Sequence, residues 1–338
     1  MTEISFPQSS PSAGPPHRRR RHLAVAVTAA AAVAAGGSAP AAQAACPADD
    51  PCPSTLPAVN MSRVVLAATL DPWRTDLVKT YGASKSVRRV EAALHRRGLL
   101  AKQSVDGYFG TATVKAWGKF ERNQKQTSRW TRNGLPGLAE LQALGKGRFR
   151  LTNTISVGKK IKLASVANGG NSDDGNDVVN KRTQSMFLEA QKNMKSNGKK
   201  GWDMTIVQGG YCGAACADAS AGTHNGGGTI DIRTWDTDSK GVSNRVAALK
   251  RVGFAAWYRP WGDNAHIHAV AINDYQMTWE IHGDGTAPDP IVGSYGGNCQ
   301  VYEWKFNFDG LSGCDQRASS KTKNQKSIVT WEMYKARK

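Results

Sequence analysis

Apolar residues recur at helical spacing in the N-terminal half of the chain. Val87, Val90 and Leu94 fall at positions i, i+3 and i+7, which predicts one helix. The same spacing predicts a second helix over about residues 111–123, and a run of leucines predicts a short third helix over about residues 135–144. Glycine-containing turns separate these segments, so this part of the sequence predicts a small three-helix bundle.

Strand-like alternation appears in the C-terminal half. Residues 202–208 and 229–232 alternate between apolar and polar side chains, as half-buried strands do. Residues 152–163 alternate enough to predict a pair of strands, whereas residues 183–194 return to helical spacing and predict one more helix. The predicted fold class is therefore α+β, with the helical bundle preceding a mixed domain.

The N-terminus has the pattern of an export signal. Arginines at 18–21 precede an apolar, alanine-rich run over residues 23–35, and an Ala-Gln-Ala sequence at 42–44 fits a signal-peptidase site. The apolar run is too short to span a bilayer as a permanent helix. We therefore expect a signal peptide over residues 1–44 and export by the Sec or the twin-arginine route. The mature protein is expected to be secreted, extracellular or associated with the cell wall, without an integral membrane segment.

The formal net charge is +18, which favours a polyanionic partner. Nucleic acid is one such partner, but no stretch has the pattern of a zinc finger, a basic zipper or an aromatic RNA-binding strand. We therefore expect no nucleic-acid binding. For an exported protein, the anionic polymers of a bacterial wall are the expected source of negative charge.

Six cysteines also fit an exported protein, because an even number in an oxidising compartment predicts disulfide bonds. Proximity along the chain suggests the pairs 46–52, 212–216 and 299–314. The alternative is that Cys212 and Cys216 are metal ligands, since thiolates bind zinc well.

The candidate chemistry lies between residues 223 and 270. His224 precedes Asp231 by seven positions, and glycines at 226–228 allow the backbone to fold closely between them. On a strand, His266 and His268 would share one face, with Cα atoms about 6.6 Å apart. Imidazole and carboxylate groups suit zinc, and a hydrolytic zinc needs three protein ligands and an open position. These residues predict a site for one zinc ion per chain, with one clustered histidine binding the metal and the other addressing the metal-bound water or the substrate.

The helical part resembles a known wall-binding module. The run Asp-Gly-Tyr-Phe-Gly at 106–110, followed by Thr113, is similar to the signature of the three-helix peptidoglycan-binding domain found beside many wall hydrolases. The resemblance implies that residues 83–146 bind peptidoglycan.

The histidine motifs resemble those of the zinc D-alanyl-D-alanine carboxypeptidase family and its relatives with the lysostaphin and hedgehog-type fold. That family has His-x6-Asp followed by His-x-His, and this chain has both motifs. The resemblance implies an α+β zinc-peptidase domain with a central antiparallel sheet. It also implies that His224, Asp231 and His268 bind the metal and that His266 is the catalytic residue beside it.

Relatives place a tyrosine–arginine pair upstream of the first histidine, where this chain has Gly-Tyr-Cys at 210–212. That arginine steadies the substrate and the developing oxyanion, so another side chain has to replace it. Gln208, Tyr211 and Arg259 are the candidates. Trp257 resembles the aromatic approach to the last histidine motif, and we include it among the predicted substrate-binding residues.

The predicted organisation has five parts: a signal peptide (1–44), an N-terminal lead-in (45–82), a peptidoglycan-binding domain (83–146), a zinc-peptidase domain (150–314) and a basic C-terminal tail (315–338). The expected function is that of an exported peptidoglycan peptidase, a D,D-carboxypeptidase or an endopeptidase, which hydrolyses stem-peptide amide bonds through a metal-bound water. One alternative is a non-catalytic wall-binding protein with a structural zinc. Another is a zinc peptidase that acts on ordinary protein.

Overall fold

The structure is a computed structural model, and it describes residues 55–74, 77–124, 134–163, 178–211, 223–277 and 328–338. The chain divides into two compact units, residues 1–45 and 46–338, and every described residue belongs to the second unit. The predicted signal peptide and all six cysteines, with their proposed pairings, lie outside the described residues. Helices and strands occur together, and this mixed content is compatible with the predicted α+β class.

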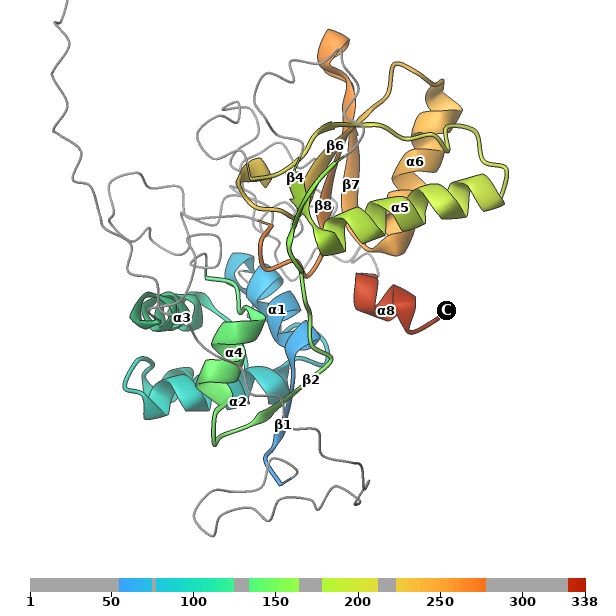
Figure 1. Cartoon of the computed structure of the whole chain (residues 1–338). Coiled ribbons are helices and arrows are strands. Elements are labelled where there is room, and N and C mark those ends of the chain that lie inside the picture. Colours follow the sequence, from blue (N-terminus) through green and yellow to red (C-terminus); the bar gives the residue numbers. More distant parts are fainter. Residues whose placement is uncertain (1–54, 75–76, 125–133, 164–177, 212–222, 278–327) are drawn as a thin grey trace, which may run out of the picture. The chain divides into compact units, whose positions relative to one another are not determined.

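Four helices lie in the N-terminal part of the described chain (Figure 1). They are α1 (Met61–Leu70), α2 (Ser84–Arg96), α3 (Thr111–Asn123) and α4 (Leu138–Gly145), with short 3-10 turns at Asp71–Trp73 and Lys102–Ser104. Helices α2, α3 and α4 fall where the apolar spacing predicts helices. Helix α1 lies within the predicted lead-in and is buried along most of its length.

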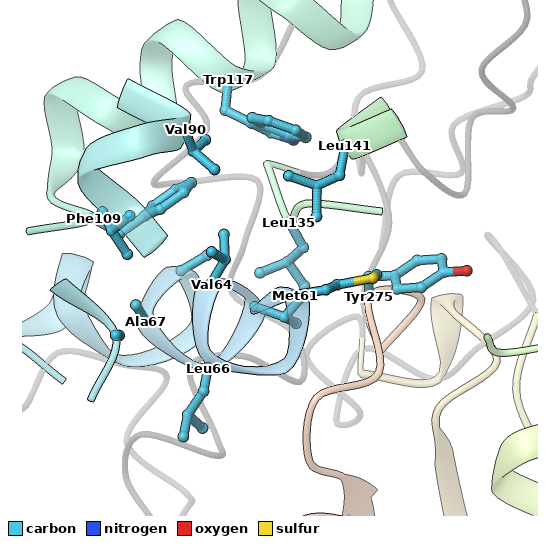
Figure 2. Packing of buried hydrophobic residues seen from close by; sticks show 14 of the residues in the cluster. Met61, Val64, Leu66, Ala67, Val90, Phe109, Trp117, Leu135, Leu141 and Tyr275 are labelled. Carbon is cyan, nitrogen blue, oxygen red and sulfur yellow. The ribbon is translucent and has the colours of Figure 1, made fainter. Parts of the chain in front are cut away.

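The side chains of these helices share one apolar core. Figure 2 shows Val64 of α1, Val90 of α2, Trp117 of α3 and Leu141 of α4 pointing toward one another. Trp117 is fully buried, so its indole serves packing rather than a surface contact. Burial of each such side chain stabilises the fold by about 1.5–3 kcal/mol.

Buried carboxylates fix the turn at 106–110. Glu91 accepts hydrogen bonds from the Gly107 N–H at 2.7 Å and from the Thr113 hydroxyl at 3.0 Å. Asp71 accepts one from the Phe109 N–H at 3.1 Å. Burial raises the pKa of Glu91 to about 7 and that of Asp71 to about 6, although these hydrogen bonds oppose the shift. Gly107 has a φ of +83°, which a glycine adopts without strain.

The remaining elements follow in the order β3 (Lys160–Lys162), β4 (Val178–Asn180), α5 (Lys181–Ser196), β5 (Ile206–Gln208), a 3-10 turn at Thr223–Asn225, β6 (Thr229–Arg233), α6 (Ser239–Val252), β7 (Phe254–Arg259), a 3-10 turn at Gly262–Asn264, β8 (His266–Ala271) and α8 (Trp331–Lys335). Side-chain caps begin two of these helices, because Asn180 accepts from the N–H of Thr183 and Asp238 accepts from that of Gly241. Gly253 ends α6 in the left-handed conformation typical of a helix C-terminus.

Two short strands form near the predicted strand pair at 152–163, but they do not pair with each other. Strand β2 (Arg150–Thr152) pairs in parallel with β1 (Ala58–Asn60), and β3 pairs antiparallel with β4. The prediction of a local pair was therefore wrong. Asn153 and Gly158 both have positive φ, so the chain turns between β2 and β3. The two strands therefore pair with other segments of the chain rather than with each other.

Strands β5, β6, β8 and β7 form a four-stranded antiparallel sheet in that order. Helices α5 and α6 lie beside it (Figure 1). Alternate residues such as Ile230, Ile232 and Ile267 are fully buried in a core shared with these helices. Asp231 lies between Ile230 and Ile232 on β6, and His268 follows Ile267 on β8. Because successive side chains of a strand alternate in direction, Asp231 and His268 point to the opposite face.

The last residues of the chain pack against α5. Trp331 borders the core between α5, α6 and the sheet, and Tyr334 donates its hydroxyl to Glu189 at 2.7 Å. The Arg182 Nε lies 3.0 Å from Glu332 Oε1 and holds α8 in place. The end of the predicted basic tail is thus docked, while residues 315–327 lie outside the described residues. Among the residues that the structure describes, no helix combines the length and apolar character needed to cross a membrane.

Candidate metal centre

Asp231 lies in the middle of β6, directly opposite His268 of β8. The His268 Nδ1 is 2.7 Å from the Asp231 Oδ1. Trp257 is the β7 partner of His268, and the two rings stack with centroids 6.3 Å apart. The sheet register therefore fixes the carboxylate, the imidazole and the indole in one cross-strand row.

His224 reaches the same carboxylate from the short turn before β6. Its Nε2 is 3.3 Å from the Asp231 Oδ1, and its ring centroid is 5.3 Å from that of His268. Its Nδ1 lies 2.6 Å from the backbone carbonyl of Gly209, which fixes the tautomer with the proton on Nδ1. The Nε2 therefore carries the lone pair that faces the carboxylate.

The glycines between His224 and Asp231 allow a close backbone approach. A Cβ at Gly227 would lie 2.4 Å from the Tyr211 hydroxyl oxygen, and one at Gly210 would lie 2.1 Å from the Gly226 carbonyl oxygen. No side chain fits at either position without movement of its neighbour. The glycine run thus serves packing of the loop that carries His224, as the sequence predicts.

His224, Asp231 and His268 can together hold a metal ion. Each offers one ligand atom, all of these atoms lie within 4.8 Å of one another, and all three residues are buried. Two imidazoles and a carboxylate suit divalent cations such as zinc. Nδ1 of His224 is held by a backbone carbonyl, which is the usual support for a ligating histidine. The residues present therefore fit a metal site.

The protonation states also fit metal binding. Burial raises the pKa of the Asp231 carboxyl, but the neighbouring His224 and His268 lower it more, and the net pKa is well below its usual value. Burial, together with the positive charge of Arg259, lowers the pKa of His268 to about 3. An ionised carboxylate and a neutral imidazole are the forms that bind metals.

His266 lies beside this group rather than within it. Its Nδ1 is 2.6 Å from the Asn264 carbonyl oxygen, so this nitrogen carries the proton. Its Nε2 is 3.6 Å from the Asp231 Oδ2 and has no hydrogen-bond partner among the described residues. The Trp261 ring packs against the His266 ring in a T-shaped arrangement, with centroids 5.2 Å apart. The lone pair of Nε2 is thus directed at the edge of the metal site.

Three of the four predicted substrate-binding residues pair with residues of the site across the sheet, and the fourth lies on a loop. Trp257 and Arg259 lie on the sheet face of the cluster, opposite His268 and His266 respectively. Gln208 is the β5 partner of Asp231. Tyr211 packs on the loop instead: its hydroxyl lies 2.5 Å from the side-chain carbonyl of Gln276 and donates to it.

Three features of the site were not predicted from the sequence. The carbonyls of Gly209 and Asn264 orient the two histidines, and Arg233 stands opposite His266 on β6. Arg233 could have been found, because it follows Asp231 by two residues, directly after the strand predicted over residues 229–232, and so shares its face if that strand continues by one residue. The Gly209 carbonyl has no sequence signal, since any residue supplies a carbonyl.

Comparison of the chain with protein-family models, with curated proteins and with solved structures found no match in any of the three. The class of site is defined by its own residues: a buried His-Asp-His group, able to hold a metal ion, with a third histidine at its edge.

Proposed function

We propose that the chain is an exported zinc-dependent peptidase that hydrolyses amide bonds in the stem peptides of peptidoglycan. The observation that carries the proposal is the buried group of His224, Asp231 and His268, with the Nε2 of His266 beside it. Three protein ligands with an open position are the arrangement of catalytic rather than structural zinc sites. The helical part and the positive charge of the chain support a bacterial cell wall as the place where the protein acts.

His224, Asp231 and His268 would hold a single zinc ion. When bound, zinc polarises a substrate carbonyl and lowers the pKa of a water molecule toward 7. Amide hydrolysis at neutral pH needs both effects, because water is a weak nucleophile and the amide carbonyl a poor electrophile.

His266 would move the proton that amide hydrolysis requires. Its Nδ1–H is held by the Asn264 carbonyl, so its Nε2 can accept a proton at the edge of the site. The same nitrogen can then deliver the proton to the leaving amine. The 3.6 Å separation from the Asp231 Oδ2 is short enough for that carboxylate to stabilise the protonated imidazole.

Peptidoglycan is the proposed substrate because of the helical part. The turn at 106–110, which resembles the signature of peptidoglycan-binding domains, is held by the buried Glu91 and Asp71 at the start of α3. A net charge of +18 suits the anionic polymers of a bacterial wall. Export through the signal-like residues 1–44 would place the protein there, secreted or wall-associated. The central antiparallel sheet and the three-helix wall-binding domain of the resembled families are part of the same proposal.

One observation favours a second candidate, a non-catalytic wall-binding protein with a structural zinc. His224 and His268 are fully buried, as ligands in closed structural sites are. In that case His266 would be the fourth ligand. The two candidates differ in whether His266 is needed for zinc binding or for turnover.

The test is to incubate the purified protein with defined muropeptides and with casein, each with and without a zinc chelator. The proposal predicts chelator-sensitive release of D-alanine or of stem-peptide fragments from muropeptides and no cleavage of casein. Zinc-loaded protein that binds peptidoglycan but releases nothing would instead support the structural-zinc candidate. Cleavage of casein alone would identify an ordinary protein as the substrate.

A further inference from the structure

Strand β7 has an open edge on the side away from β8. In the order β5-β6-β8-β7, it is the last strand of the sheet that the structure describes. The Ile272 N–H donates to the Gly253 carbonyl at 3.0 Å, so these two opposed residues form a hydrogen-bonded pair. Because such pairs alternate along an antiparallel ladder, the N–H and C=O groups of Ala256 and Tyr258 point away from β8. These outward groups have no hydrogen-bond partner among the described residues.

A cleft of about 680 Å³ lies between this edge and α6. Its volume is typical of ligand sites. Ser239, Ser243 and Ala247 line it at intervals of four residues, so they form one stripe along α6. All three are small and exposed, and they leave space that longer side chains on this stripe would fill.

The lining of the cleft combines hydroxyl groups with apolar surface. Thr237, Ser239 and Ser243 supply hydroxyls from the turn before α6 and from its first two turns. Val242 of α6 and Ala256 of β7 are buried and supply apolar surface. A ligand that suits this lining has both an apolar face and several hydrogen-bonding groups.

Tyr258 adds an aromatic ring to the cleft. It is 46% exposed, although it lies on a strand whose other side chains are mostly buried. One acid and one base also border the cleft, Asp238 and Lys250, so its lining has no net formal charge. A neutral ligand with an apolar face therefore fits better than a phosphate or another anion.

We propose that this cleft binds the N-acetylated amino sugars of a glycan strand, an assignment that rests on the proposed peptidoglycan substrate. The acetamido group of such a sugar is itself an amide, so it can pair with the outward N–H and C=O groups of β7 as an added strand would. The apolar face of the sugar ring would pack on the ring of Tyr258. Its hydroxyls would bond to those of Thr237 and Ser243.

The place of the cleft in the fold favours sugar over the stem peptide. Trp257 borders the cleft, and its indole stacks on His268, so the cleft begins at the strand next to the metal ligand. Ala256 and Tyr258 alternate with Trp257 and point to the α6 face of the sheet. The peptide has to reach the metal face to be cleaved, whereas the glycan stays intact and can occupy the opposite face.

The two places are close enough for one substrate. A ligand beside β7 is two strand spacings from β8, or about 10 Å. About three extended peptide residues span that distance. A stem peptide attached to a sugar in the cleft would therefore present to the metal a bond some residues away from the sugar.

The test measures binding of a glycan that has no peptide. Tri-N-acetylchitotriose, cellotriose and a free stem pentapeptide are titrated by calorimetry into chelator-treated protein, so that zinc takes no part. Cellotriose has the same linkage but lacks the acetamido groups. The wild-type protein should bind tri-N-acetylchitotriose about 10-fold more tightly than cellotriose, because the acetamido group adds hydrogen bonds to β7.

Two variants locate the binding. Tyr258→Ala removes the exposed ring and should weaken binding of the trisaccharide about 10-fold. Ser243→Phe fills the cleft from an exposed position on α6 and should lower the number of trisaccharides bound per chain by one. Trp202→Ala is the matched control, because this ring is 40% exposed but does not line the cleft. It should leave affinity and stoichiometry unchanged.

Thermal melts establish that each variant is folded, and Tyr258→Ala carries the test if Ser243→Phe is unstable. Unchanged affinity and stoichiometry in the folded cleft variants overturn the inference, as does a wild type without preference for the acetylated sugar. A stem pentapeptide that binds the wild type and is lost in Ser243→Phe would make the cleft a peptide site and also overturn it.

The outcome is separable from that of the proposed function. Glycan binding that depends on Tyr258, without cleavage of any muropeptide, would leave the inference standing and reject the peptidase. Chelator-sensitive cleavage of muropeptides by a protein whose cleft binds no glycan would do the reverse.

Discussion

His266 and His268 stand two residues apart on one strand, yet their surroundings differ. His268 is fully buried against Asp231 and Trp257, whereas His266 lies at the edge of the group with its Nε2 free of hydrogen bonds among the described residues. The His-x-His spacing alone was enough to predict that both side chains share a face. Which of them ligates depends on the register with β6, because only His268 is paired with Asp231.

The candidate ligand residues could be predicted from the sequence, but the backbone groups that orient them could not. His224, Asp231 and His268 stand out because histidines are few and clustered in this chain. The Gly209 and Asn264 carbonyls and the row position of Arg259 depend on non-local pairing, which no local pattern encodes.

Gly227→Ala should weaken zinc binding about 10-fold, because the added Cβ would collide with the Tyr211 ring and displace the loop that orients His224. Competition with a chromogenic zinc chelator measures this affinity. In a Tyr211→Ala background the collision partner is gone, so the same substitution should have much less effect. Equal losses in the two backgrounds would show that the contact does not position the ligand.

At the level of helices and strands, the amphipathic helices α2 and α3 were predicted from the sequence, whereas the largely buried α1 was not. Helices α2 and α3 each have a polar face, so their period is visible in the sequence. Helix α1 buries eight of its ten residues and has no polar face to define a period. The pairing of β2 was predicted wrongly because its partner, β1, lies about 90 residues earlier in the sequence, and local alternation does not identify so distant a partner.

The helical part should lose stability as the pH rises from about 4.5 to about 7, because burial raises the pKa of Glu91 above its ordinary value of 4.5 to about 7. The folded state favours the protonated carboxyl, so this contribution is complete below pH 4.5 and is lost as the pH passes 7. Its size is roughly 2–3 kcal/mol.

Glu91→Gln tests this dependence, because the amide oxygen can accept from the Gly107 N–H while the amide nitrogen donates to the Thr113 hydroxyl. Urea unfolding at pH 5 and at pH 7.5 should show a smaller loss of stability in the variant than in the wild type. Glu189→Gln is the control, since the pKa of Glu189 is lowered and its removal should not reduce the loss. Parallel pH dependence in the wild type and Glu91→Gln would contradict the assignment.

At the level of the whole molecule, one contact joins α5 to α8 through two residues that are 150 positions apart in the sequence. Arg182 of α5 is buried and bonds to Glu332 of α8 through Nε and Nη2, and its Nη2 also donates to the Ile272 carbonyl. The sequence indicated only a basic tail here, because alternation and charge do not report which distant residues dock. Burial raises the pKa of Glu332, but the charge and hydrogen bonding of Arg182, with smaller contributions from the Glu332 backbone N–H and Lys335, together lower it below its ordinary value.

Glu332→Gln should destabilise the protein by about 2–4 kcal/mol, because it leaves the buried guanidinium with Asp274, 3.8 Å away, as its remaining acidic neighbour. Chemical unfolding at pH 7 measures the loss. Lys338→Ala removes an exposed pair with Glu189 at the same end of the chain and should change stability little. Similar small effects from both substitutions would mean that α8 is not an integral part of the fold.

In the proposed site, His224, Asp231 and His268 hold zinc while His266 serves turnover. Zinc content per chain, measured by mass spectrometry on purified wild type, His268→Ala and His266→Ala, tests it most directly. We expect a single zinc ion in the wild type, nearly all of it retained in His266→Ala, and little in His268→Ala. Equal zinc loss in the two variants would rule out this division of roles, because His266 would then be a ligand.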